Sequence, residues 1–137
     1  MSQNIENGKL GEHICMVKLI KMGVSCSLAH IDAMDIVVHH EGRMIRVQVK
    51  SSTLKYNGKK TKSYQFAVCH TGKKIPLTEA ECDVVALVAV DCERILFLPV
   101  GCVKGNVTKR IQPQKFDKLN LEERSWQHCL DRIFLSD

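Results

Sequence analysis

The stretch from Asp35 to Ser52 constrains the fold of this chain more than any other. It reads as two strands joined by a short polar segment with a glycine at 40–43, which is typical of a hairpin. In the second strand three aliphatic residues alternate with three polar ones: Ile45, Val47 and Val49 with Arg46, Gln48 and Lys50. Successive side chains of a strand point to opposite faces, so we expect Gln48 and Lys50 to share a face, roughly 7 Å apart.

The closed hairpin would bring Asp35, at the start of the first strand, close to Lys50 near the end of the second. A carboxylate, an amide oxygen and a lysine would then converge. The two oxygens are hard ligands suited to Mg²⁺ or Mn²⁺, and a lysine beside them can orient or deprotonate a water, or neutralise charge on a phosphate. The simpler explanation, more common on spacing alone, is the solvated face of an antiparallel sheet.

The pattern of Asp35, twelve intervening residues and then Gln48-Val49-Lys50 resembles the core motif of the PD-(D/E)XK nuclease superfamily, an acid, a spacer and then acid-x-Lys. Two positions depart from that motif. Met34 stands where the family has proline, and Gln48 replaces the second acid. The pattern is similar to that of the subgroup containing intron-encoded homing endonucleases with a Gln-x-Lys motif, and more loosely to archaeal-type Holliday junction resolvases.

The resemblance continues outside the motif. Residues 8–23 resemble the family's opening helix, in which Glu12 matches an additional acid. Residues 83–99 resemble a later pair of strands, and Trp126 lies in a closing helix. The family fold is α+β, a restriction-endonuclease-like domain with a central mixed β-sheet flanked by helices. We expect it as a single domain over residues 1–137.

The resemblance implies a Mg²⁺-dependent DNA endonuclease in which Mn²⁺ can substitute. Asp35, Gln48 and Glu12 would hold the metal and its water, directly or through water, with the backbone carbonyl of Val49 as a further ligand. Lys50 would position or activate the attacking water. One chain carries one such site, so cutting both strands of DNA requires two copies, in a homodimer or homotetramer.

The substrate stays open at this point. A homing or restriction-like enzyme would read bases of double-stranded DNA in the major groove, whereas a resolvase would recognise the shape of branched DNA. The loss of an acid at Gln48 also allows a non-catalytic DNA-binding protein on a degenerate nuclease fold. A purely structural or protein-interaction domain would leave the combination of Glu12, Asp35, Gln48 and Lys50 unexplained.

Two acids have alternative explanations. Asn7 is a reasonable N-cap for a helix over 8–22 that ends at Gly23. Glu12 would then lie in its first turn, where a carboxylate complements the helix dipole without any role in catalysis. Asp32 precedes Asp35 by three residues and is the other candidate for the motif acid, although a turn-forming role suits it better.

Lysines concentrate in residues 54–63, the segment that follows the strand with the Gln-x-Lys motif. Asn57-Gly58 is a strong turn signal, and the segment is either a solvated hairpin tip or a surface that contacts DNA phosphates. We favour DNA contact because the segment follows the candidate site directly. The predicted DNA-contacting residues are Arg46, Lys55, Tyr56, Lys59, Lys60, Lys62, Lys73 and Lys74.

Composition adds three expectations. The net charge of +5 suits a polyanionic partner without requiring one. The seven cysteines form no Cys-x-x-Cys pair and no signal peptide is recognised, which favours reduced structural thiols in a cytoplasm, with Cys15, Cys69 and Cys102 in apolar surroundings. The family resemblance implies a bacterial, archaeal or phage-like context. No apolar run reaches the roughly 18 residues needed to span a bilayer, so no membrane association is expected.

Overall fold

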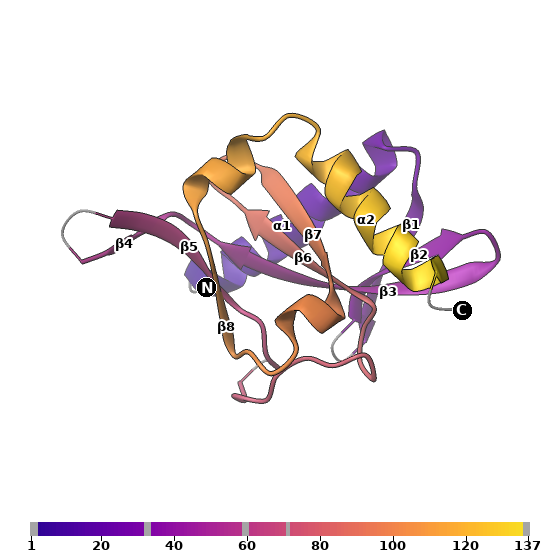
Figure 1. The fold of residues 1–137 in the computed structure, drawn as a ribbon, viewed down its shortest axis with the longest axis horizontal. Coiled ribbons are helices and arrows are strands. Elements are labelled where there is room, and N and C mark those ends of the chain that lie inside the picture. The colour runs from indigo at the N-terminus through magenta and orange to yellow at the C-terminus, as the bar shows by residue number, and fades with distance from the viewer. Residues whose placement is uncertain (1–2, 32–33, 59–60, 71, 136–137) are drawn as a thin grey trace.

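A computed structural model describes residues 3–31, 34–58, 61–70 and 72–135 (Figure 1). The helices are α1 (Gln3–Lys21) and α2 (Leu121–Leu135), with short 3₁₀ turns η1 (Val100–Val103) and η2 (Pro113–Asp117). The five strands of the larger sheet, in spatial order, are β1 (Ser25–Ile31), β2 (Met34–His40), β3 (Arg43–Ser52), β6 (Val84–Ala89) and β7 (Arg94–Pro99). A smaller sheet contains β4 (Lys55–Asn57), β5 (Thr61–Ala67) and β8 (Thr108–Ile111).

The predicted hairpin is the centre of the larger sheet. β2 and β3 pair in antiparallel fashion, and they are joined by Glu41 and Gly42, which both have positive φ (50° and 77°). Two such residues form the turn whose twist matches the strands of a hairpin. On its other side β3 pairs in parallel with β6, so the sheet is mixed, as the α+β prediction required.

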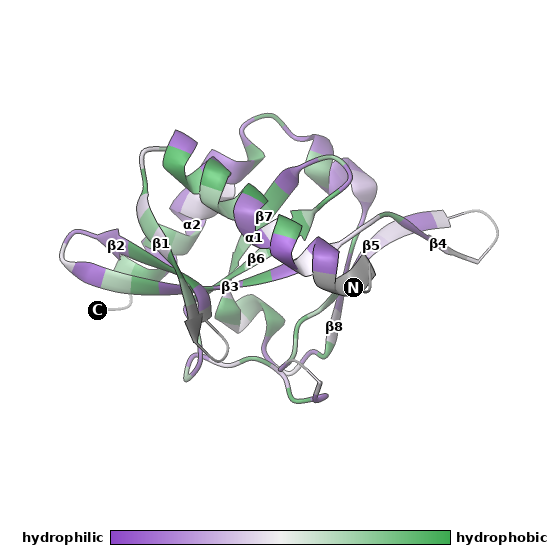
Figure 2. Cartoon of the chain, turned by 180° about the vertical axis from the view of Figure 1, so that it is seen from behind, coloured by the Kyte–Doolittle hydropathy of each residue, from purple (hydrophilic) through white to green (hydrophobic). Residues whose placement is uncertain are grey.

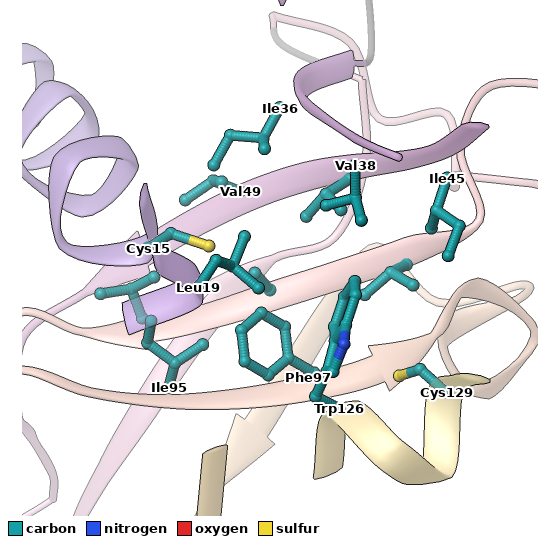
Figure 3. Close-up of a cluster of buried hydrophobic side chains, with 14 of the residues drawn as sticks. Cys15, Leu19, Ile36, Val38, Ile45, Val49, Ile95, Phe97, Trp126 and Cys129 are labelled. Atoms are coloured by element: carbon teal, nitrogen blue, oxygen red, sulfur yellow. The ribbon is translucent and has the colours of Figure 1, made fainter. Parts of the chain in front are cut away.

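Both helices cover one face of the larger sheet (Figure 1). The core between them contains Leu19 of α1, Val38 and Ile45 of the hairpin, and Trp126 of α2, which packs edge-on against Phe97 at 5.2 Å (Figure 3). Trp126 thus lies in a closing helix, as predicted, and packs that helix against the sheet. The smaller sheet and η2 cover the other face through a second apolar cluster, so that every residue of β6 is buried.

The opening helix begins earlier than predicted. It starts at Gln3, so Asn7 lies inside it and is not its N-cap. Glu12 consequently lies in the third turn, beyond the reach of the N-terminal dipole, which removes the simpler explanation for this acid. The helix does end before Gly23, whose φ of +79° suits glycine. After Gly23 the chain enters β1, which continues to Ile31.

All seven cysteines are free thiols. Cys15, Cys69, Cys82 and Cys129 are buried, and burial raises the pKa of Cys82 to about 12, so these thiols act as small apolar side chains. Cys102 is exposed, which contradicts the apolar setting predicted for it. Within the part of the chain that the structure describes, neither helix combines the length and apolar character needed to cross a bilayer.

Candidate active site

Asp35 lies directly beside the strand that carries the Gln-x-Lys motif. Ile36 pairs with Val47, so the antiparallel register places Asp35 opposite Gln48, and side chains of opposed residues share a face. The Asp35 Oδ2 atom accepts a hydrogen bond of 2.8 Å from the backbone N–H of Val49. This bond holds the carboxylate against β3. Asp32, the alternative acid, lies outside the described residues.

Gln48 is a buried amide with an unsatisfied acceptor. The side chain is 6% exposed, and its Oε1 atom has no hydrogen-bond partner among the residues that the structure describes. Leaving a buried polar group unpaired costs about 1–3 kcal/mol, so such a group calls for a ligand or a water. A cation that prefers oxygen ligands, bound on the face that Gln48 shares with Asp35, would supply the missing partner of the Gln48 Oε1 atom.

The donor set at this point is of the kind that suits Mg²⁺. Asp35 and Gln48 present oxygen atoms, and no group of three or more His, Cys, Asp or Glu side chains able to hold a metal occurs in the described part of the chain. The amide at position 48 reduces the number of charged ligands. Mg²⁺ is commonly held by one or two carboxylates together with waters and substrate phosphate oxygens, so these residues fit it better than they fit Zn²⁺.

Lys50 is the cation of the cluster. Its Nζ atom donates a hydrogen bond of 2.8 Å to the backbone carbonyl of Cys69, which fixes the ammonium group at the end of β3. Burial lowers the pKa of Lys50 below its ordinary value, and the nearby Cys69 and Asp35 side chains offset part of that shift. The side chain is thus placed and partly desolvated, as expected for a residue that handles a water or a phosphate oxygen.

Helix α1 approaches the same end of β3 through a glycine. A Cβ atom built on Gly11 would lie 1.8 Å from Oγ of Ser51, so only glycine permits the observed separation between helix and strand. Glu12, the next residue, is half-buried. The close packing brings the backbone beside Glu12 within contact of the residue that follows Lys50.

The predicted DNA-contacting residues are distributed over two segments. The β4–β5 hairpin projects from the body of the molecule and is largely polar (Figures 1 and 2). Tyr56 is 66% exposed there, with Nζ of Lys62 4.6 Å from the centre of its ring, and Lys55 is exposed as well. Lys59 and Lys60 lie outside the described residues.

Lys73 and Lys74 belong to the connection between β5 and β6. They line a pocket of about 540 Å³ together with Lys50, so this part of the basic surface adjoins the candidate site. Their side chains are exposed. The spacing in the sequence did not predict that these two lysines and Lys50 share one pocket.

Arg46 takes part in a network of hydrogen bonds within the fold, and the DNA contact predicted for it stays a prediction. Its guanidinium donates two hydrogen bonds to the Asp83 carboxylate (3.2 and 3.1 Å) and others to the carbonyls of Glu79 (2.7 Å) and Ala80 (2.9 Å). The Asp83 hydrogen bond raises the pKa of Arg46 further. The side chain therefore ties β3 to the start of β6.

Replacing Arg46 with alanine should destabilise the protein without changing its response to salt. Loss of this network costs about 2 kcal/mol of unfolding free energy, as usual for a broken set of charge-assisted bonds. If Arg46 contacts no phosphate, the plot of log Kd for duplex DNA against the logarithm of the salt concentration has the same slope for Arg46→Ala as for the wild type. Denaturant titration and binding isotherms measure the two quantities, and a shallower slope would support the predicted DNA contact.

One pair beside the site was missed from the sequence. Nε2 of His70 lies 2.7 Å from Oε1 of Glu81, whose Oε2 accepts bonds from the backbone N–H and the hydroxyl of Thr78. The only local signal is the Thr-x-x-Glu spacing of residues 78–81, which is typical of a capping box. Its pairing with His70 depends on the tertiary structure.

Comparison with known proteins finds a protein family and solved structures of similar fold. A family model described as PD-(D/E)XK endonuclease matches residues 2–128. Among solved structures, the bacterial homing endonuclease I-Ssp6803I is similar over 96% of this chain and 95% of its own, with a TM-score of 0.71 and 19% sequence identity. At that identity the structural similarity concerns the fold. No curated protein sequence matches the chain.

Proposed function

The chain belongs to the PD-(D/E)XK endonuclease family, and we propose that it is a Mg²⁺-dependent endonuclease that hydrolyses phosphodiester bonds in double-stranded DNA, in the manner of a homing or restriction-like enzyme. The observation that carries the proposal is the convergence of Asp35, Gln48 and Lys50 on one face of the β2–β3 hairpin. Residues 1–137 form one nuclease domain in this proposal.

Asp35 and the unsatisfied Oε1 of Gln48 would hold the cation, with Glu12 and the carbonyl of Val49 as further oxygen donors, directly or through water. When bound, Mg²⁺ or Mn²⁺ supplies stabilisation of the negative charge that builds on the phosphate oxygens. Lys50 orients or deprotonates the water that attacks phosphorus. The hydrogen bond from Lys50 to Cys69 holds the amine in place for that task.

The protein would act on DNA inside a reducing cytoplasm, where its seven thiols stay free. The β4–β5 hairpin, with Lys55, Tyr56 and Lys62, offers a two-stranded ribbon of the size that enters a major groove. Lys59 and Lys60 extend the same segment in sequence. One site cuts one strand, so a double-strand break requires a homodimer or homotetramer.

One observation favours a second function. Gln48 stands where the family motif has an acid, and a site with fewer charges binds a divalent cation less tightly. A protein that lost cleavage while keeping salt-sensitive DNA binding would retain the same fold and the same lysines.

A cleavage assay separates these functions. We expect purified protein to cut DNA in Mg²⁺ or Mn²⁺ and not in excess EDTA, on at least one of three substrates: plasmid, linear duplex and a synthetic four-way junction. Discrete duplex fragments identify a site-specific enzyme, and cutting of the junction alone identifies a resolvase. The matched control is Asp35→Asn, which keeps the size of the side chain but loses its charge.

Two results would contradict the proposal. Undiminished cleavage by Asp35→Asn removes Asp35 from the site. Salt-sensitive binding with no metal-dependent cutting of any substrate, including a library of randomised duplexes, favours the non-catalytic function.

A further inference from the structure

His70 is held in a defined orientation by an ionised carboxylate. Hydrogen bonds from the hydroxyl and the backbone N–H of Thr78, and then from His70, lower the pKa of Glu81 to about 2. Glu81 therefore accepts the Nε2–H of His70 at 2.7 Å. The bond to Glu81 uses Nε2 and leaves Nδ1, the second nitrogen of the ring, for a ligand.

The position of His70 relates it to the candidate active site. It follows Cys69, whose carbonyl accepts the hydrogen bond from Lys50, and both residues line the 540 Å³ pocket. Lys73 and Lys74 line the same pocket, because the segment after His70 turns back on itself, with the Lys73 N–H donating to the His70 carbonyl at 3.0 Å. No acidic side chain is among the described residues that line it.

Such a lining selects for an anion. The three lysines repel a metal ion and attract a phosphate, and a histidine whose ring carries both protons can donate from Nδ1 to a phosphate oxygen. The charged groups that face His70 are thus Glu81 on one side and Lys50, Lys73 and Lys74 on the other.

We propose that this pocket binds a phosphate of the DNA backbone beside the scissile one, and that His70, oriented by Glu81, donates a hydrogen bond to it through Nδ1. The inference rests on the nuclease function proposed above and adds a substrate contact to it. It makes the His70–Glu81 pair part of the DNA-binding surface rather than a brace of the β5–β6 connection.

Two substitutions of His70 test the roles of its two ring nitrogens one at a time. The amide of glutamine reaches about as far as Nε2 and can keep the bond to Glu81, whereas the shorter asparagine places its N–H₂ close to the position of Nδ1. We expect His70→Gln to bind a linear duplex roughly tenfold more weakly at 0.1 M salt without divalent metal, with a salt slope smaller by about 1. His70→Asn should lose less affinity but more thermal stability.

The control is His128→Gln, which changes an exposed histidine of α2 on the far face of the sheet and should bind like the wild type. If His70→Gln keeps the affinity and salt slope of the wild type while His70→Asn is merely less stable, His70 is a structural brace and the inference fails. Cleavage by the wild type would leave the nuclease function standing in that case. A wild-type protein that binds no DNA overturns both proposals.

Discussion

Replacing Lys50 with methionine is expected to lower the cleavage rate about a thousandfold and to lower DNA affinity by no more than about tenfold. Loss of a residue that orients or deprotonates the attacking water typically costs 10²–10⁴ in rate. Affinity should change less, because the ammonium is engaged by the Cys69 carbonyl and adds at most one of several phosphate contacts. Single-turnover cleavage and binding without metal measure the two effects separately.

The matched control for Lys50 is Lys55→Met, which removes an equal charge from the exposed β4–β5 hairpin. That variant should bind DNA more weakly and still cut it at saturating protein. Cleavage by Lys50→Met at a rate near that of the wild type would exclude the lysine from catalysis.

Lys50→Met also changes the stability of the protein, separately from its effect on cleavage. Burial lowers the pKa of Lys50 below 10.5, so the unfolded chain binds the proton more tightly than the folded one. Below the lowered pKa the charge therefore destabilises the fold, and this cost is relieved as the pH rises toward 10.5. We expect Lys50→Met to have a Tm at pH 7 no lower than that of the wild type, and its relative advantage to shrink at alkaline pH.

Replacing Gly11 with alanine is expected to destabilise the protein by about 1–3 kcal/mol, the usual cost of forcing an added methyl group into a packed interface. The new Cβ would meet Ser51 Oγ at 1.8 Å and Ser51 Cβ at 3.0 Å, so rotating the serine hydroxyl away still leaves a tight contact with the serine Cβ. The helix must move away from β3, and Glu12 moves with it. We also expect cleavage to fall by about 10²-fold, as a displacement near 1 Å can cost that much.

Gly8 provides the comparison within the same helix. A Cβ at Gly8 meets no atom within 4 Å, so Gly8→Ala should raise the unfolding free energy by about 0.5–1 kcal/mol through helix propensity alone. Adding Ser51→Gly to Gly11→Ala removes both clashing atoms and should restore part of the lost stability and cleavage. Equal stabilisation by Gly8→Ala and Gly11→Ala would show that α1 does not press on β3.

Sequence patterns predicted the elements whose signals are local. The hairpin around Gly42 follows from the alternation of apolar and polar residues, and the end of the first helix before Gly23 follows from the conformation of glycine. The closing helix around Trp126 and the strands within residues 83–99 were expected from the family resemblance. The positions of Asp35, Gln48 and Lys50 on a common face could also be predicted from local signals, because they depend only on the two-residue period of a strand and on one turn.

Other features depended on contacts between distant segments. The helix begins at Gln3 rather than after Asn7, because a good capping residue does not start a helix when the preceding residues can also be helical. Arg46 is at an alternating polar position, as a DNA contact would be, and only the approach of Asp83, 37 residues away, assigns it to the fold. A charged side chain binds whichever partner the chain brings within reach, and local sequence does not encode that partner.

The surroundings of the catalytic motif belong to the same category. The sequence is sufficient to propose the acid, the amide and the lysine, since their relative positions depend on a single hairpin. The Cys69 carbonyl that holds Lys50, the Ser51 contact that requires Gly11, and the His70–Glu81 pair come from the packing of α1 and of the β5–β6 connection against the end of β3. Such contacts join segments that are far apart along the chain, so they follow from the three-dimensional arrangement and not from any periodicity within one element.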